Sequence, residues 1–180
     1  LILISSIFLI ISTARDAINL LKNKEYNISR IIAHFSFGLL ILFIGLNYNF
    51  SSEKDFNLKV GEVKKFENFS IKFKDLNLKE FKNYKAVIGT FEIDDFKDNT
   101  KLFLSPQIRI YDNPSTLTYE ASIRSGLLKD FYITMSNIDR SDYYNIKFQK
   151  KPFMVWIWIS VILISLSGFL RFFKYENKIN

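Results

Sequence analysis

The run from Ile31 to Tyr48, IIAHFSFGLLILFIGLNY, constrains this chain more than any other feature. It is apolar and carries no formal charge at neutral pH, and about 17–25 such residues cross a bilayer as a helix. It also holds His34, the only histidine in the sequence. Ionisable side chains inside a span are costly, usually face other protein groups, and are functional candidates by default. The sequence therefore predicts a transmembrane helix whose one histidine is the first candidate site residue.

Two further apolar blocks, Leu1 to Ile11 and Phe153 to Phe173, flank this run, and a polar segment of about a hundred residues, a normal size for a small domain, separates the second block from the third. Within that segment apolar residues alternate with polar ones, as in Phe69, Ile71 and Phe73 and again in Tyr144, Ile146 and Phe148. Such alternation, broken by turn residues, is typical of antiparallel strands. The predicted fold class is a membrane α-helical protein with two full spans and one partial span. An inserted β-rich extracytoplasmic domain, an antiparallel sandwich or a small barrel, completes it.

The predicted boundaries follow from these blocks. Because Leu1 to Ile11 starts apolar, with no Met and no charged region before it, we expect it to be the tail of a span that begins upstream. Ser12 or Thr13 is expected to cap a short interfacial helix in the connection that follows. The expected segments are a partial transmembrane helix (1–12), a cytoplasmic connection (13–30), a transmembrane helix with His34 (31–48), a periplasmic β-rich domain (49–152), the last transmembrane helix (153–173) and a cytoplasmic tail (174–180).

Charge sets the expected orientation. The net charge is +7, yet positive and negative residues are nearly balanced between Glu53 and Lys151. That balance argues against a nucleic-acid surface on the domain. The excess lies beside the apolar blocks, and positive residues close to span ends favour the cytoplasmic side. Those residues are Arg15, Lys22, Lys24 and Arg30 before the second block, and Arg171, Lys174 and Lys178 after the third. Both groups place the domain outside.

The domain offers no obvious catalytic set. The chain has no cysteine, which excludes disulfides and thiolate redox motifs within it, and the domain has no histidine. Common nucleophile–base arrangements are therefore absent. Asp94, Asp95 and Asp98 are interpreted as a solvated turn rather than a calcium site. The segment from Glu120 to Tyr132 lacks a clean period, and we expect a loop or short helix that presents a surface, with ordinary core packing as the alternative.

His34 has three possible roles on the residues alone: a hydrogen bond to a neighbouring helix, proton relay, or ligation of a metal or haem iron as neutral imidazole. Gly38 and Gly45 lie on the same helical face as His34. Small residues on a membrane helix allow close approach of a neighbour. That neighbour is either another helix or a flat ligand beside the imidazole.

Several short motifs, in order along the chain, resemble the C-terminal region of the CcmF family, the haem lyase subunit of bacterial and mitochondrial cytochrome c maturation. Each motif is weak alone, whereas the ordered set is specific. The motifs are Ala33-His34-Phe35 with Gly38, Asn47-Tyr48, Val60-Gly61-Glu62, Asn83-Tyr84 to Phe91, Pro106 to Tyr111, Tyr119 to Ile123, Lys129 to Tyr132, and Lys151-Pro152-Phe153 with Trp156-Ile157-Trp158.

The resemblance implies part of a haem lyase that attaches haem to apocytochrome c. It implies that His34 is an axial ligand of the iron of a haem b, with the second ligand and the transferred haem's histidines supplied by upstream chain. Arg30, about one turn away, is then expected to reach a haem propionate, and Gly38 to leave room for the macrocycle. By this resemblance the fragment is not expected to be active alone.

The same resemblance implies the setting. The expected location is a bacterial or mitochondrial inner membrane, and the expected partners are haem, apocytochrome c and other maturation proteins such as a haem chaperone and a CcmH-type subunit, with no nucleic acid. The alternative is a non-enzymatic, membrane-anchored β domain for protein binding or scaffolding. In that alternative His34 only bonds a neighbouring helix.

Overall fold

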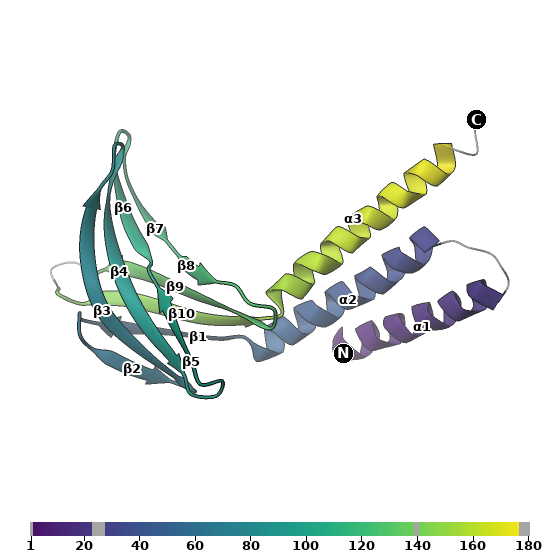
Figure 1. Cartoon of the computed structure of the whole chain (residues 1–180), viewed down its shortest axis with the longest axis horizontal. Helices are drawn as coiled ribbons and strands as arrows, with labels where there is room; N and C mark the ends of the chain where they lie inside the picture. Colours follow the sequence, from purple (N-terminus) through teal and green to yellow (C-terminus); the bar gives the residue numbers. More distant parts are fainter. Residues whose placement is uncertain (1, 23–27, 139–140, 177–180) are drawn as a thin grey trace. The chain divides into compact units, whose positions relative to one another are not determined.

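The computed structural model of the chain describes residues 2–22, 28–138 and 141–176. It divides into two compact units. One unit holds the helices and comprises residues 1–51, 126–129 and 151–180, and the other is built of strands and comprises residues 52–125 and 130–150. Figure 1 shows the course of the chain through both.

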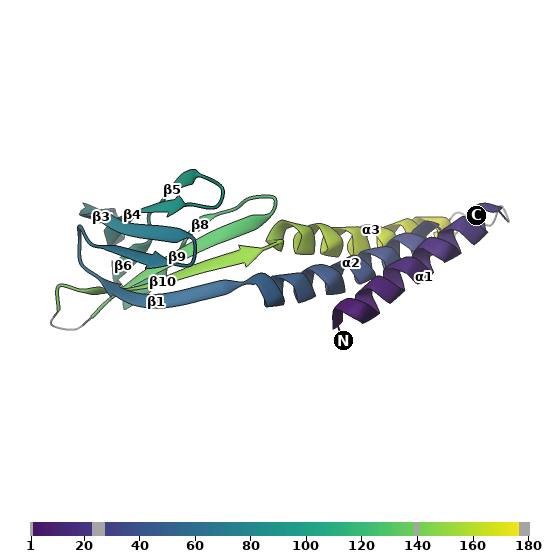
Figure 2. The same ribbon diagram turned by 90° about the horizontal axis from the view of Figure 1, so that it is seen from below.

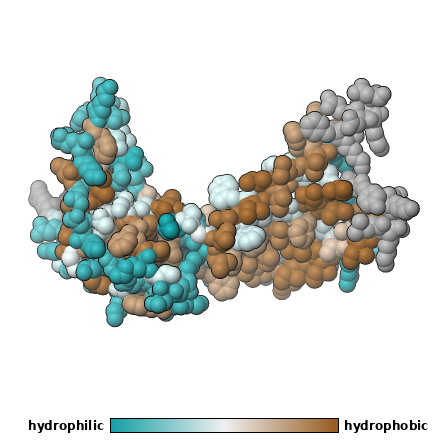
Figure 3. All heavy atoms as spheres, in the orientation of Figure 1, coloured by the Kyte–Doolittle hydropathy of each residue, from teal (hydrophilic) through white to brown (hydrophobic). Residues whose placement is uncertain are grey.

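The helical unit contains three long apolar helices: α1 (Ile2–Lys22), α2 (Ile28–Phe50) and α3 (Met154–Glu176). Each includes a segment long and apolar enough to cross a membrane, namely Ile2–Leu20, Ile28–Phe50 and Met154–Phe172. Figure 3 shows that the visible surface of these helices is largely hydrophobic. A surface of that kind is stable only in lipid or under other protein, and together with the length of the helices it agrees with the prediction of membrane helices.

Helix α1 corrects the predicted boundary near its middle. The sequence led us to end a helix at residue 12 and to begin a separate connection, but α1 continues to Lys22. The Thr13 hydroxyl caps no new helix; it donates a 2.8 Å hydrogen bond to Leu9 O within the same helix. A threonine satisfied in this way no longer competes with the helix backbone. The rest of the predicted connection, residues 23–27, lies outside the described residues.

Helix α2 packs between the other two helices. On one face, a Cβ atom added at Gly38 would lie 2.8 Å from Ile10 Cγ1, and one at Gly45 2.9 Å from Leu3 Cδ2, so the glycines allow α1 to approach closely. Residue 36 lies two positions before Gly38, about 200° around the helix, and so faces the opposite side.

The opposite face of α2 meets α3. The Ser29 hydroxyl donates a 2.6 Å bond to Ser167 O. Fourteen positions further along, Phe43 stacks on Trp156 with ring centroids 5.6 Å apart. At the same end the Asn47 side-chain amide donates to Pro152 O, just before α3 begins. These contacts hold α2 and α3 as an antiparallel pair.

The strand unit is a sandwich of two antiparallel sheets, not a barrel (Figures 1 and 2). One sheet has the order β1-β10-β9-β8, and the other has the order β2-β3-β4-β6-β7, with β5 also paired to β4. The strands are β1 (Ser52–Leu58), β2 (Val63–Phe66), β3 (Phe69–Glu80), β4 (Tyr84–Asp95), β5 (Thr100–Leu104), β6 (Gln107–Asp112), β7 (Ser115–Glu120), β8 (Ser122–Arg124), β9 (Lys129–Asn137) and β10 (Tyr144–Pro152).

The core lies between the two sheets and is rich in phenylalanine. Phe73 and Phe91, neighbours on β3 and β4, stack with centroids 4.4 Å apart and are fully buried. Phe148 of the other sheet packs against Phe69 at 5.3 Å. The alternation seen in the sequence explains this arrangement, because successive side chains on a strand point to opposite faces and one face of each sheet is covered.

Tight turns join several of the strands. Gly61, between β1 and β2, has a φ of +91°, a conformation that side-chain-bearing residues rarely adopt. Residues 96–99 connect β4 to β5, and Asn113-Pro114 connects β6 to β7. At the start of the domain α2 runs on to Phe50, so the first strand begins at Ser52.

Candidate functional site

His34 lies in the second turn of α2, on the face that α1 approaches. Its Nδ1 is 2.9 Å from Arg30 O, one turn earlier in the same helix. Because a carbonyl oxygen only accepts, this contact places a proton on Nδ1, so in the neutral imidazole the lone pair is on Nε2. The ring is exposed among the described residues. The imidazole is therefore oriented by its own helix and directs Nε2 away from that hydrogen bond.

A small polar cavity lies beside the ring. Its volume is about 200 Å³, and its lining residues are Thr13 and Asp16 of α1 and Arg30, Ile31 and His34 of α2. The cavity is smaller than the roughly 300–1,000 Å³ of sites that enclose a whole organic ligand. These residues can therefore form one wall of a larger site, along which lie a carboxyl group, a guanidinium and an imidazole, but they do not enclose a whole ligand.

Of the predicted site residues, Arg30 and His34 come together at this cavity, and Gly38 does not line it. Gly38 is buried against Ile10 of α1. The sequence analysis allowed either another helix or a flat ligand beside Gly38, and in the structure the neighbour is helix α1. A place for a macrocycle beside Gly38 stays a prediction, and this packing gives it no support.

Asp16 and Thr13 are cavity residues that the sequence analysis missed. Both were assigned to a connection outside the membrane, because the first helix was ended at residue 12. The apolar spacing through Ala14, Ala17 and Leu20 was the available signal, since it continues the helical pattern across Thr13.

Ser36 was also missed. Among the described residues its hydroxyl oxygen is buried without a hydrogen-bond partner, on the face of α2 that meets α3. An unpaired buried hydroxyl costs about 1–3 kcal/mol.

The acidic turn of the sandwich is a structural feature. Asp95 is 1% exposed, not solvated as the sequence suggested. Its Oδ1 accepts backbone hydrogen bonds from Lys97 N at 3.0 Å and Asp98 N at 3.4 Å, so the carboxylate organises the β4–β5 turn. Across the ranges that the structure describes, no group of three or more His, Cys, Asp or Glu side chains could hold a metal ion.

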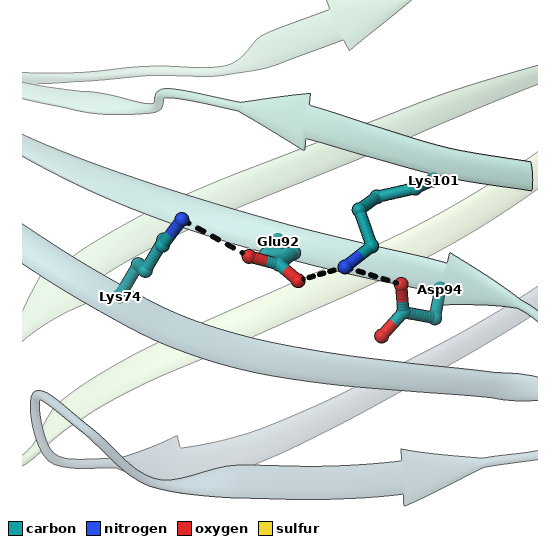
Figure 4. Close-up of polar contacts among 4 residues, drawn as sticks. All are labelled: Lys74, Glu92, Asp94 and Lys101. Carbon is teal, nitrogen blue, oxygen red and sulfur yellow. Dashed lines mark hydrogen bonds and ion pairs between the residues drawn. The ribbon is translucent and has the colours of Figure 1, made fainter.

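A line of alternating charges runs across β3, β4 and β5 (Figure 4). Glu92 of β4 pairs with Lys74 of β3 at 3.2 Å and with Lys101 of β5 at 2.5 Å, and Lys101 also reaches Asp94 at 3.5 Å. Hydrogen bonds from Lys101 and Lys74 lower the pKa of Glu92 from its ordinary value. Such cross-strand pairs fix register more than they create a site.

The segment from Glu120 to Tyr132 is a β hairpin rather than the expected loop or short helix. It runs through β8, a tight loop at residues 125–128, and the start of β9. Asp130 is 4% exposed and accepts hydrogen bonds from Ser125 Oγ at 3.3 Å and from the Tyr132 hydroxyl at 3.4 Å. Burial, and then the Asp130 charge, raise the pKa of Tyr132. The loop between the strands does present a surface, because Leu127 and Leu128 are 71% and 66% exposed.

Comparison with known proteins adds the family context. The model of a family described as the CcmF C-terminal beta-sandwich matches residues 49–152. The cytochrome c-type biogenesis protein CcmF of Haemophilus influenzae is 28% identical over 151 residues, which cover 83% of this chain and 23% of that protein. The Escherichia coli protein of the same name is 24% identical over 153 residues, with the same two coverages.

A solved structure of a cytochrome c haem lyase CcmF has the same fold over 78% of this chain and 23% of its own length, with a TM-score of 0.58 and 16% identity. The chain therefore spans 23% of the length of these two relatives, or about a quarter. The resemblance noted from the motifs is confirmed over the strands and the membrane helices together.

Proposed function

The chain belongs to the CcmF family, and on that premise we propose that it is the C-terminal part of a haem lyase that attaches haem to apocytochrome c. The relatives are named for cytochrome c biogenesis, which supports a role in cytochrome c maturation. The chain covers 23% of the length of the Haemophilus influenzae protein. The proposed haem lyase activity would therefore belong to a longer protein or complex of which these residues are one part.

We further propose that His34 is an axial ligand of haem b. The observation that carries this proposal is the hydrogen bond from Nδ1–H to Arg30 O, which leaves the Nε2 lone pair available. Histidines that bind metals usually donate their other ring N–H to a carbonyl or carboxylate in this way. A histidine that only joined helices would bond another helix, whereas the partner here is on its own helix.

The surroundings of the ring agree with this role. The exposed ring edge and the open cavity allow a group outside these residues to approach Nε2. Arg30 lies on the same cavity and carries a charge suited to a propionate, so it is the proposed propionate contact. A bound haem supplies an iron that can exchange single electrons. His34 and Arg30 would then hold one side of the haem, and upstream chain would supply the opposite nitrogen.

The remaining assignments are orientation and partners. We propose that the sandwich lies on the periplasmic side of an inner membrane, because the basic residues beside the helices favour the cytoplasm. There it would meet apocytochrome c and other maturation proteins, among them a haem chaperone and a CcmH-type subunit. A reporter enzyme fused after Asn180 should be active in the cytoplasm, and periplasmic activity would contradict this orientation.

The haem proposal is tested in the complete gene product by its visible spectrum and haem content. His34→Ala should lose the low-spin b-type signal, and His34→Gly should recover it when imidazole is added. Phe35→Leu, a change at the exposed neighbouring position, should keep the signal. The rescue separates lost ligation from misfolding. A full b-type signal in a folded His34→Ala protein would leave the anchored scaffold domain as the remaining interpretation.

A further inference from the structure

The loop at residues 126–128 combines strong exposure with an apolar tip. Leu127 and Leu128 are 71% and 66% exposed, and they are consecutive residues in the loop between β8 and β9. Exposed leucine pairs of this kind are unfavourable in water, which indicates that something covers them.

The position of the loop identifies the cover. The residues 126–129 belong to the helical unit, not to the sandwich from which they extend. Leu128 O accepts a 2.9 Å hydrogen bond from Phe153 N, and Phe153 directly precedes the first residue of α3. The tip of the hairpin is therefore fixed at the level where a membrane-spanning helix begins.

The loop is also built to hold this position. A Cβ atom on Gly126 would lie 2.8 Å from Lys129 O, so the chain turns more tightly there than a larger residue allows. Behind it, the Ser125 hydroxyl and the buried Asp130 carboxylate are hydrogen bonded at 3.3 Å. A loop constrained at both ends projects its two leucines without the ordering cost that a flexible loop would have on insertion.

The ends of α2 and α3 at this level carry the side chains expected in the headgroup zone. Tyr48 and Phe50 are 84% and 61% exposed at the end of α2, and Trp158 is 62% exposed in α3. Trp158 lies five residues beyond Phe153, about 7.5 Å deeper along the helix. Aromatic side chains gather at this depth of a bilayer, whose hydrocarbon core is about 30 Å thick.

We propose that Leu127 and Leu128 insert into the outer edge of the lipid bilayer and form a non-helical membrane contact beside the start of α3. The ligand is the acyl and glycerol region of phospholipids beside α3. Insertion of a pair of leucines into this zone is the same physics by which interfacial segments bind membranes.

The test uses nitroxide labels on single cysteines in the complete gene product, reconstituted in phosphatidylcholine–phosphatidylglycerol vesicles. The 180 residues contain no cysteine, so each introduced thiol is unique within them. Labels at positions 127 and 128 should collide several-fold more with oxygen, which concentrates in lipid, than with a water-soluble nickel chelate. A label at Leu78, 66% exposed on β3, is the matched water-exposed control.

A label at Ile162, 57% exposed within α3, keeps this inference separate from the membrane assignment itself. If position 162 is in lipid while 127 and 128 behave like 78, the loop proposal is overturned and the span stands. If labels at 127 and 128 are shielded from both reagents, protein covers the loop and the proposal is equally overturned. Preference for oxygen at 127, 128 and 162 alike supports it.

Discussion

Alanine at Gly38 should weaken the contact between α1 and α2. The added Cβ would lie 2.8 Å from Ile10 Cγ1, a distance that real contacts essentially never show. Because Cγ1 is close to the main chain, relief requires the helix itself to move. Overpacking of this kind costs about 1–3 kcal/mol, whereas Ala in place of a helical Gly gains about 0.5–1 kcal/mol. The expected net loss is therefore about 0–2.5 kcal/mol.

Two other glycines provide matched controls. Gly168 of α3 has nothing within 4 Å of the Cβ position, so Gly168→Ala should be neutral or stabilising. At Gly45 the nearest atom is Leu3 Cδ2 at 2.9 Å, the end of a flexible side chain that can rotate away. Its alanine variant should therefore lie between the other two in stability.

The assay is unfolding of the complete protein in mixed detergent micelles with increasing dodecyl sulfate, followed by circular dichroism. In an Ile10→Ala background the Gly38→Ala change should cost less, because the opposing atom is gone, and a double-mutant cycle measures this coupling. Equal midpoints for Gly38→Ala and Gly168→Ala, or no coupling to Ile10, would refute the close helix approach.

Two further predictions concern the sandwich. Glu92→Gln should destabilise the domain at neutral pH, because it removes the ion pairs with Lys74 and Lys101. Because the pKa of Glu92 is lowered in the folded state, the difference in stability between the variant and the wild type should shrink as the pH falls below 4.5, the ordinary pKa of this group. Acid denaturation curves measure this difference, and a difference that does not change with pH would contradict the prediction. Asp95→Ala should lower the stability of the domain by about 1–3 kcal/mol, because it leaves turn amides such as Lys97 N unpaired. Asp95→Asn keeps an acceptor oxygen and should cost less. Limited proteolysis measures both variants, and equal susceptibility of the two would contradict this role of the carboxylate.

Periodicity was sufficient to predict the main architecture. The alternation of Phe69, Ile71 and Phe73 placed these residues in the core, because a strand with one covered face must alternate. The membrane helices were predicted from the length of the apolar runs, because about 20 apolar residues are needed to cross a bilayer as a helix. Sandwich and barrel were not distinguished, since closure depends on pairing between distant strands such as β1 with β10.

Local polar signals were less informative. Thr13 reads as a cap in sequence, yet its hydroxyl bonds Leu9 O and the helix continues. Asp95 reads as solvated, yet it is buried as the acceptor of its own turn. The Thr13 hydroxyl can either cap a new helix or bond within a continuing one, and the Asp95 carboxylate can be either solvated or buried in its turn. The sequence allows both arrangements of each side chain, and tertiary packing decides between them.

The candidate site was predictable only in part. His34 could be predicted as a site residue because it is the only histidine in the sequence and lies in an apolar run. Arg30 could be predicted beside it because it lies about one helical turn earlier. Asp16 joined them only through the packing of α1 against Gly38, which no local pattern encodes. The role of Leu128 likewise depends on a backbone hydrogen bond to Phe153, 25 residues away in sequence.

The most direct test of the central claim is whether a nitrogen at position 34 binds haem iron. His34→Gly in the complete protein, supplied with either ¹⁴N- or ¹⁵N-imidazole, should give ferric haem whose electron spin-echo modulation changes with the isotope. An identical spectrum with both isotopes, together with haem content equal to that of the wild type, would show that the ligand lies elsewhere.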